Sequence, residues 1–346
     1  MSTPIMQNNV AAVRHLAWCL FSSPLAELNT ARTLHITATA ELTKWLDSLN
    51  KNPQHLLEYI QQNNHRLLGS YFECLWQYYF KYSPNTQLLA HHVQITQSLN
   101  HPHENSDQAN NKNSRQTNGR KTLGELDILA LIDNKPFHVE LAVKFYLLIP
   151  NVTGAQAKHW IGPQTRDRLD LKLDTLNRKQ LPFLHHPATQ KALEQRGLGQ
   201  EYESAVALKG YLFSPFNSDF TRPIESDTNL HAATNMGQWI HASDVDMILN
   251  SQSDETRWCI VEKHNWLGPV TTDQAMEDQI ELLNNQQVRL EVLSHFNYHA
   301  ENRIPYALML ISMKNSPHNI SDLCESGRYF LVPNGWPFKL ATDQAG

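Results

Sequence analysis

The sequence predicts a mixed α/β fold in which helices flank a central sheet. Three patterns support this prediction. Residues 67–79 repeat apolar side chains at helical spacing, and residues 137–149 alternate polar and apolar side chains as strands do. A charged helical segment at 165–179 precedes an apolar strand at 204–213. Helix, strand, hairpin, helix and strand therefore follow one another between about 66 and 213.

The chain is predicted to contain three segments. Residues 1–64 form an N-terminal helical segment, and residues 65–215 form the core. Residues 97–121 are predicted to be a flexible insertion, because they contain almost no apolar side chains to offset the entropy of ordering. Residues 216–346 form a C-terminal α/β extension packed on the core, with a long polar helix at about 272–294.

Composition restricts the class of protein. The 346 residues are 41% hydrophobic and 18% charged, as in ordinary globular proteins. The N-terminus lacks a secretory signal pattern, and no apolar run reaches the roughly 20 residues of a membrane span. The cysteines form no CxxC pair. We therefore expect a cytoplasmic protein without a membrane partner. The net charge of −5 disfavours strong electrostatic binding of nucleic acid but allows a local basic surface.

The two strands of the predicted hairpin carry the charged residues of greatest interest. The first contains the run 124–127, Gly-Glu-Leu-Asp, and a turn at 133–135 leads into the second. A period of two places His138, Glu140 and Lys144 on one face of the second strand, opposite a continuous apolar face. Unpaired charges are costly to bury beside a core, so we expect these side chains to form an ion pair or to bind a metal ion.

Three sequence strings carry a family resemblance: RLLGSYFECLW at 66–76, GELDILAL at 124–131 and HVELAVKFYL at 138–147. These strings are similar to a bacterial family, domain of unknown function 1853, and the resemblance to that family runs along most of the chain. The order of elements resembles the PD-(D/E)XK nuclease superfamily, with which that family has been grouped. The resemblance implies a restriction-endonuclease-like core and hydrolysis of phosphodiester bonds in DNA or RNA with Mg²⁺ or Mn²⁺.

The resemblance also implies roles for individual residues. Asp127 matches the metal-binding aspartate of the superfamily motif, and Glu140 matches the acidic residue of the third strand. Glu73 lies where many members have a helical glutamate that joins or supports the metal site. The backbone carbonyl of Leu141 is expected to supply a further ligand. Lys144 is the candidate catalytic lysine.

The lysine departs from the family pattern. The usual motif has one residue between the acid and the lysine, but this chain has three, and Ala142 occupies the usual position. Four residues of strand span about 13 Å, against about 7 Å for two. The superfamily tolerates migrated lysines, so Arg166, Arg168 and Lys172 on the next helix are alternatives to Lys144.

Further supporting roles are predicted for Glu125, which precedes the aspartate by two residues, and for Arg168 and Lys172. The side chain of Gln164 lies where a loop leads into a helix, a place that suits phosphate binding. The same segments are also typical of a plain helix start and a solvated helix face.

The sequence leads to a nuclease hypothesis and two alternatives. The first alternative is a catalytically inactive member of the fold that binds nucleic acid or protein, because the lysine is displaced and the net charge is acidic. The second is a phosphodiester hydrolase acting on small molecules. A simple ion pair between Glu140 and Lys144 would also explain their shared face.

Overall fold

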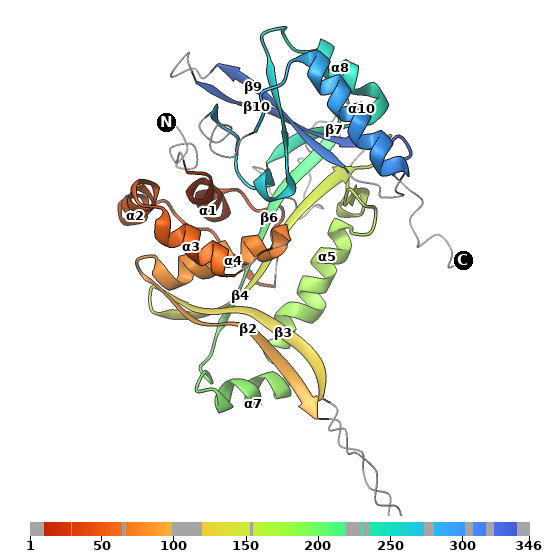
Figure 1. The fold of residues 1–346 in the computed structure, drawn as a ribbon. Helices are drawn as coiled ribbons and strands as arrows, with labels where there is room; N and C mark the ends of the chain where they lie inside the picture. The colour runs from red at the N-terminus through yellow and green to blue at the C-terminus, as the bar shows by residue number, and fades with distance from the viewer. Residues whose placement is uncertain are drawn as a thin grey trace, which may run out of the picture.

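The structure is a computed structural model, and it has the mixed α/β architecture predicted from the sequence (Figure 1). The residues that it describes are 10–28, 30–63, 65, 67–98, 120–152, 155–218, 230, 235–272, 280–301, 307–315 and 322–337. The predicted succession of helix, strand, hairpin, helix and strand is present, as α4, β2, β3 and β4, α5 and β6.

The described residues form a ten-stranded mixed sheet with the order β2-β3-β4-β6-β7-β10-β9-β8, to which β1 adds beside β6 and β5 beside β4. The strands are β1 (Arg32–Thr33), β2 (Thr86–Ser98), β3 (Arg120–Ile132), β4 (Lys135–Leu148), β5 (Trp160–Ile161), β6 (Glu203–Pro215), β7 (Met236–His241), β8 (Arg257–Val261), β9 (Leu308–Asn315) and β10 (Leu323–Val332). Strands β4, β6, β7 and β10 are parallel to their neighbours in that series, whereas β2–β3–β4 and β10–β9–β8 are antiparallel. The sheet therefore continues across residue 215, the predicted end of the core.

Helices cover both faces of this sheet (Figure 1). They are α1 (Ala11–Phe21), α2 (Ala40–Lys51), α3 (Gln54–Gln62), α4 (Leu68–Tyr82), α5 (Leu169–Thr175), α6 (Leu181–Phe183), α7 (Pro187–Gln195), α8 (Val245–Asn250) and α10 (Asn285–Glu301), with a π-helical segment η3 (Leu176–Gln180) and 3₁₀ turns η2 (Ala157–His159), η4 (Ala242–Asp244) and η5 (Lys263–Trp266). Among the described helices, none is long and apolar enough to cross a bilayer.

The alternation predicted for β4 divides its side chains between two cores. Leu141, Phe145 and Leu147 pack in the cluster that contains α1 and α4. Ala142 and Tyr146 pack in a second cluster with the leucines of α5. The even positions of β4 therefore face α5, which places the charged side chains of the strand on the side of that helix.

Several predicted boundaries were wrong. The insertion is shorter than predicted, because Gln97 pairs with Lys121 in the sheet; residues 99–119 lie outside the described residues. Helix α5 begins at Leu169 rather than Thr165, because Gly162 N–H donates to the Asp167 carbonyl (2.7 Å) in a closed loop. Within that loop Thr165 has a left-handed backbone (φ 58°), which does not continue into a helix.

The long polar helix predicted at about 272–294 is not continuous, and residues 273–279 of it lie outside the described residues. Residues 280–284 are not helical, and α10 starts at Asn285. The side-chain oxygen of Asn284 accepts the backbone N–H of Gln287 at 3.0 Å, as an N-cap does. The cap explains the start, because it satisfies an N–H group that has no partner within the helix.

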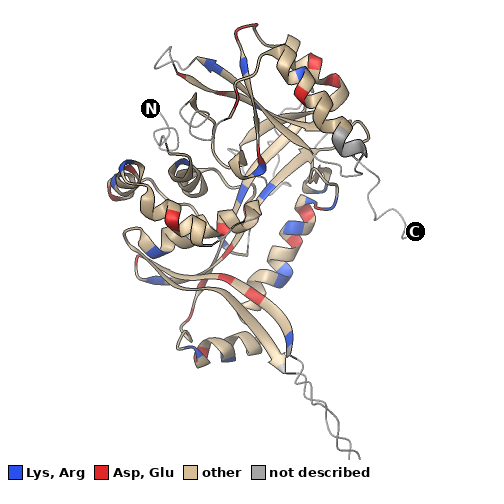
Figure 2. Ribbon diagram, viewed as in Figure 1, with Lys and Arg blue, Asp and Glu red and all other residues tan. Residues whose placement is uncertain are grey.

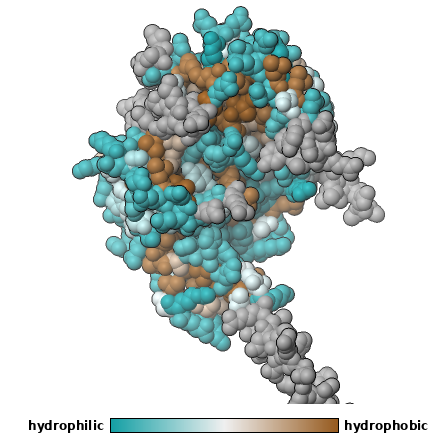
Figure 3. All heavy atoms as spheres, viewed as in Figure 1, coloured by the Kyte–Doolittle hydropathy of each residue, from teal (hydrophilic) through white to brown (hydrophobic). Residues whose placement is uncertain are grey.

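The N-terminal segment is helical as predicted, but it also adds a short strand to the sheet. Arg32 and Thr33 of β1 pair in parallel with Ala205 and Val206 of β6. On the face shown in Figure 3, an apolar patch lies in the part of the molecule that holds α8, β10 and α10. Exposed large side chains there are Met247, Leu290 and Leu293.

Candidate active site

The candidate site lies where β3 and β4 separate. The two strands pair from Ile132 and Lys135 at the turn to Ile128 and Val139. One residue further, Asp127 Oδ2 accepts the backbone N–H of Leu141 at 2.9 Å. A carboxylate thus replaces a strand-to-strand hydrogen bond at this point. Asp127 and Glu140 consequently stand on adjacent strands beside the opening.

Glu140 is fully buried and held by two neighbours. His138 Nε2 lies 3.0 Å from Glu140 Oε1, and both side chains have no exposed surface. Gln180 Nε2 donates to Glu140 Oε2 at 2.6 Å. Each carboxylate oxygen has two lone pairs, so one partner on each leaves capacity for another ligand. The position of this carboxylate is therefore fixed without its being saturated.

Lys172 of α5 is the basic side chain that joins this group. Its Nζ donates to Gln180 Oε1 at 2.8 Å, so Gln180 connects the ammonium to Glu140. Lys172, Leu176 and Gln180 are spaced four apart and share one side of the helix, which becomes π-helical at 176–180. π-helical segments are often found at functional sites.

Burial lowers the pKa of Lys172 from its usual range, and the nearby Lys144 ammonium lowers it further. The carboxylates of Glu140, Asp127 and Asp167 act in the opposite direction. Lys172 therefore lies in the electric field of both candidate metal ligands.

Lys144 stays on the predicted face of β4 but contacts a different acid. Its Nζ donates to Asp167 Oδ2 at 2.6 Å, and the Tyr146 hydroxyl donates to Asp167 Oδ1 at 3.3 Å. Arg168 forms a two-pronged pair with Asp170. Basic and acidic side chains accordingly alternate along α5 (Figure 2). Of the basic residues predicted for the site, Lys172 is the one linked to Glu140.

Glu73 of α4 contacts a histidine rather than the two strand acids. His92 Nε2 lies 3.7 Å from Glu73 Oε2 and 3.0 Å from Gln77 Nε2, and His92 Nδ1 lies 2.7 Å from Glu125 Oε1. Glu125 and Glu73 therefore share one imidazole. Burial raises the pKa of Glu73, and the charges of Glu125 and Glu140 add to this effect while His92 opposes it.

Sequence reasoning missed His92 and Gln180. His91 pairs with Ile128 and Val93 with Leu126, so His92 occupies the register position of Asp127. Its backbone is left-handed (φ 49°), which a strand pattern does not predict. Gln180 lies beyond the predicted helix end at 179, although its spacing from Lys172 was a usable signal. Gln164 lines a neighbouring cavity with Lys144 and Asp167.

The surroundings of Asp127 disfavour its ionised form. Burial, the charge of Glu140 and, more weakly, that of Glu73 raise the pKa of Asp127 to about 8, while the Leu141 N–H and the Lys172 ammonium act against them. A divalent cation would relieve this repulsion, and Mg²⁺ typically takes one or two protein carboxylates and keeps several waters. In the described part of the chain, no three His, Cys, Asp or Glu side chains converge as a metal-binding set. Asp127 and Glu140 are the two carboxylates that would hold such an ion.

This arrangement gives a prediction for stability. An unfolded aspartate titrates near pH 4 and the folded Asp127 at about 8, so between these values the native state holds an extra proton. The free energy of unfolding then falls as pH rises through this window. Urea denaturation should show wild type losing more than about 1 kcal/mol relative to Asp127→Asn between about pH 5 and about pH 8.

Thermal unfolding with and without Mg²⁺ is a second test of the same carboxylate. The ion binds the ionised carboxylate and therefore stabilises the folded state by mass action. The midpoint of thermal unfolding should rise with Mg²⁺ at about pH 8, less at about pH 5, and not at all in Asp127→Asn. A parallel pH dependence of wild type and variant, or an equal Mg²⁺ effect on both, would contradict this account of the site.

Comparison with known proteins adds the family. A search of curated proteins and a search of solved structures each returned no match. A family model described as Domain of unknown function (DUF1853) matches residues 14–332, which include every residue of the candidate site. The chain therefore belongs to the family of the domain of unknown function DUF1853.

Proposed function

We propose that this protein is a divalent-metal-dependent nuclease of the PD-(D/E)XK type. The observation that carries the proposal is the group formed by Asp127, Glu140 and Lys172, in which two carboxylates stand on adjacent strands and a half-buried lysine is linked to Glu140 through Gln180. The order α4, β2, β3, β4, α5 and β6 supports it, because a restriction-endonuclease-like core has the same succession.

Each residue has a chemical task in this proposal. Asp127 and Glu140 hold the Mg²⁺, which when bound supplies Lewis-acid polarisation of the phosphate and a water of lowered pKa. The amine of Lys172 is held by Gln180 beside Glu140, and its lowered pKa gives it a larger fraction of the neutral, proton-accepting form than an exposed lysine has. Gln180 fixes the distance between Lys172 and Glu140.

The reaction is hydrolysis. The oxygen of a water molecule attacks phosphorus and gives a proton to the Lys172 amine, while the bond from phosphorus to the leaving sugar oxygen breaks and that oxygen takes a proton from solvent water. The resulting Lys172 ammonium then stabilises the charge on the phosphate oxygens. Lys144 and Arg166, which line the cavity beside the site, are placed to contact phosphates of the same strand.

A cleavage assay tests the proposal. End-labelled single- and double-stranded DNA and RNA are incubated with Mg²⁺ or Mn²⁺ and wild-type protein or Glu140→Gln. The glutamine variant is preferable to alanine, because it keeps the volume, one oxygen to accept from Gln180 and an amide group beside His138, and removes the charge. We expect cleavage of one polymer class by wild type, with at least about a hundredfold loss in the variant.

One observation favours the alternative of an inactive binding module: both oxygens of Glu140 already have protein partners. That alternative predicts that wild type binds nucleic acid or protein but cleaves nothing with either ion. Equal cleavage by wild type and Glu140→Gln would instead indicate a contaminating nuclease. Cleavage of small phosphodiesters but of no polymer would identify a small-molecule hydrolase.

A further inference from the structure

A cavity beside the loop at 162–167 has a charge opposite to that of the chain as a whole. Its volume is about 380 Å³, in the range of ligand-binding pockets. Three basic side chains, Lys144, Arg166 and Lys263, line it together with one acid, Asp167. The described lining therefore has an excess of two positive charges, whereas the chain carries −5. The candidate metal ligands are not among these lining residues, so the cavity is separate from the metal centre.

The positive groups of this cavity are accessible to solvent. Arg166 and Lys263 are exposed, and the Lys144 side chain is 33% exposed. The Lys144 ammonium is paired with Asp167, but neither Arg166 nor Lys263 forms an ion pair with another described residue. Two cations without a counter-charge thus line the same cavity, and the exposed amide of Gln164 adds a neutral donor. An anion can reach these groups without any movement of the core.

Hydrogen bonds fix the loop at 162–167 against β4. Gly162 N–H donates to the Asp167 carbonyl at 2.7 Å and so closes the loop. The Asp167 carboxylate accepts from Lys144 at 2.6 Å and from the Tyr146 hydroxyl at 3.3 Å. Both oxygens of this acid are therefore engaged by β4, and its charge is offset by Lys144 before any ligand binds.

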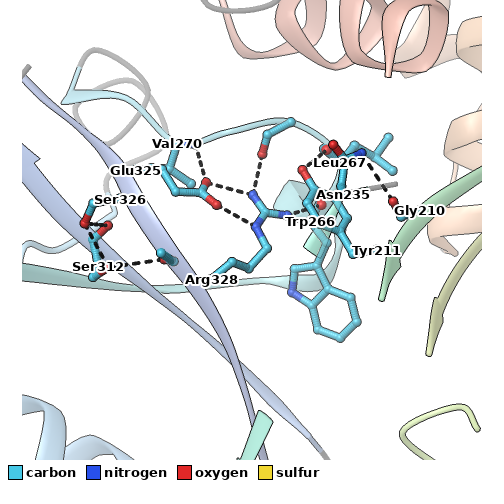
Figure 4. Close-up of polar contacts among 12 residues, drawn as sticks. Gly210, Tyr211, Asn235, Trp266, Leu267, Val270, Ser312, Glu325, Ser326 and Arg328 are labelled. Atoms are coloured by element: carbon cyan, nitrogen blue, oxygen red, sulfur yellow. Dashed lines mark hydrogen bonds and ion pairs between the residues drawn. The ribbon is translucent and has the colours of Figure 1, made fainter. Parts of the chain in front are cut away.

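The turn η5, which carries Lys263, is held by a buried arginine (Figure 4). Arg328 donates to the carbonyls of Trp266 at 2.6 Å and Gly268 at 2.7 Å. The Lys263 ammonium lies 5.8 Å from the centre of the Trp266 ring. Both walls that carry cations are thus preorganised, which reduces the entropy lost when a ligand binds.

The charge and the lining of the cavity indicate the class of anion. A phosphate monoester carries about −1.5 to −2 at pH 7, which matches the excess of two positive charges. An internal phosphodiester of a strand carries a single charge. Arginine binds phosphate oxygens through parallel hydrogen bonds. The rest of the lining is mainly apolar and includes Leu67, which is 70% exposed and can contact the nucleoside attached to the phosphate.

We propose that this cavity binds the terminal phosphate monoester of a nucleic-acid strand, with Arg166 and Lys263 on the phosphate oxygens. The inference rests on the proposed function and deepens it, because it assigns substrates that have a phosphorylated end. Lys144 and Glu140 lie on one face of β4, four residues or about 13 Å apart. A strand held at its end in the cavity would therefore reach the acids after about four stacked nucleotides.

The test is a binding measurement in EDTA, so that it depends neither on metal nor on cleavage. Fluorescence anisotropy compares internally labelled oligonucleotides of one sequence with a phosphate at the 5′ end, at the 3′ end or at neither end. Wild type should bind one of the phosphorylated strands at least about tenfold more tightly than the unphosphorylated strand. In Arg166→Met and in Lys263→Met this preference should fall to about twofold or less, because each variant lacks one of the two unpaired cations.

A matched control separates this site from general attraction by positive charge. Arg257→Met makes the same change at an exposed arginine at the start of β8, outside this cavity, and should keep the wild-type preference. Arg166 and Lys263 are exposed, so their variants should fold. Equal binding of all three strands by wild type would overturn the proposal. So would a preference that stays undiminished in both Arg166→Met and Lys263→Met.

Smaller phosphates distinguish the source of the ligand. Calorimetry with a nucleoside monophosphate and with inorganic phosphate should give affinities at least about tenfold weaker than that of the phosphorylated strand, because neither has the further phosphates of a strand. If the nucleoside monophosphate binds as tightly as the phosphorylated strand, the cavity is a site for a free nucleotide. That result would overturn the assignment to a strand end.

The outcome is distinguishable from failure of the proposed function. A preference for a phosphorylated end that depends on Arg166, in a protein without cleavage activity, would retain the cavity assignment and remove the nuclease. Metal-dependent cleavage by a protein without this preference would do the reverse.

Discussion

Replacing Lys172 with Met should lower the rate of cleavage at least about a hundredfold, whereas Lys144→Met should lower it less than about tenfold. The reason is geometric. Lys172 is linked to Glu140 through Gln180, whereas Lys144 is paired with Asp167. Methionine retains the length of the side chain and removes the charge and the proton-accepting amine.

The measurement is the single-turnover cleavage rate on the polymer that wild type cleaves. Lys179→Met is the matched control, because Lys179 is exposed on the helical segment that follows α5. A role for Lys172 as proton acceptor also predicts that the rate of wild type rises with pH and that this rise is absent in Lys172→Met. A larger loss of cleavage rate in Lys144→Met than in Lys172→Met would identify Lys144 of β4 as the catalytic lysine, as the sequence first suggested.

Replacing Arg328 with Ala should destabilise the protein by about 3–5 kcal/mol, the cost typical of breaking a buried ion pair from one side. The Arg328 side chain is 2% exposed and makes a two-pronged pair with Glu325 at 2.8 and 2.9 Å. Its guanidinium also lies 4.3 Å from the centre of the Tyr211 ring. Alanine leaves a carboxylate and two carbonyls without this donor.

Urea denaturation of a set of variants measures this effect. Arg328→Lys should recover only part of the loss, because an ammonium does not reproduce the planar fork of donors. Arg328→Met combined with Glu325→Gln should be more stable than Arg328→Ala, since neither charge then remains unpaired. A loss below about 1 kcal/mol in Arg328→Ala would show that water replaces the guanidinium at little cost.

Periodicity predicted those parts of the fold that depend on local pattern. The β3–β4 hairpin and β6 followed from alternation and apolar runs, because their side chains divide between two cores. Helix starts were predicted less well. The start of α5 depends on a closed loop at 162–167, and the break before α10 on the cap at Asn284; neither produces a periodic signal.

The candidate site was also predicted only in part. Alternation alone placed Glu140 and Lys144 on one face, which is where the structure has them. The sequence did not show which acid Lys144 contacts, since Asp167 approaches it from a loop. His92 depends on a left-handed residue inside a strand, and Gln180 on a helix that continues past its predicted end. Both are products of tertiary packing.

The position of β6 has a consequence for the order of folding during synthesis. One edge of β6 pairs along its length with β4, while its other edge meets β1 near its start and β7 at its end. Contacts between residues so distant in the chain form slowly, because a long loop must close first. The β3–β4 hairpin can therefore form early on the ribosome, whereas the N-terminal segment must wait for β6 to emerge before it finds its place in the sheet.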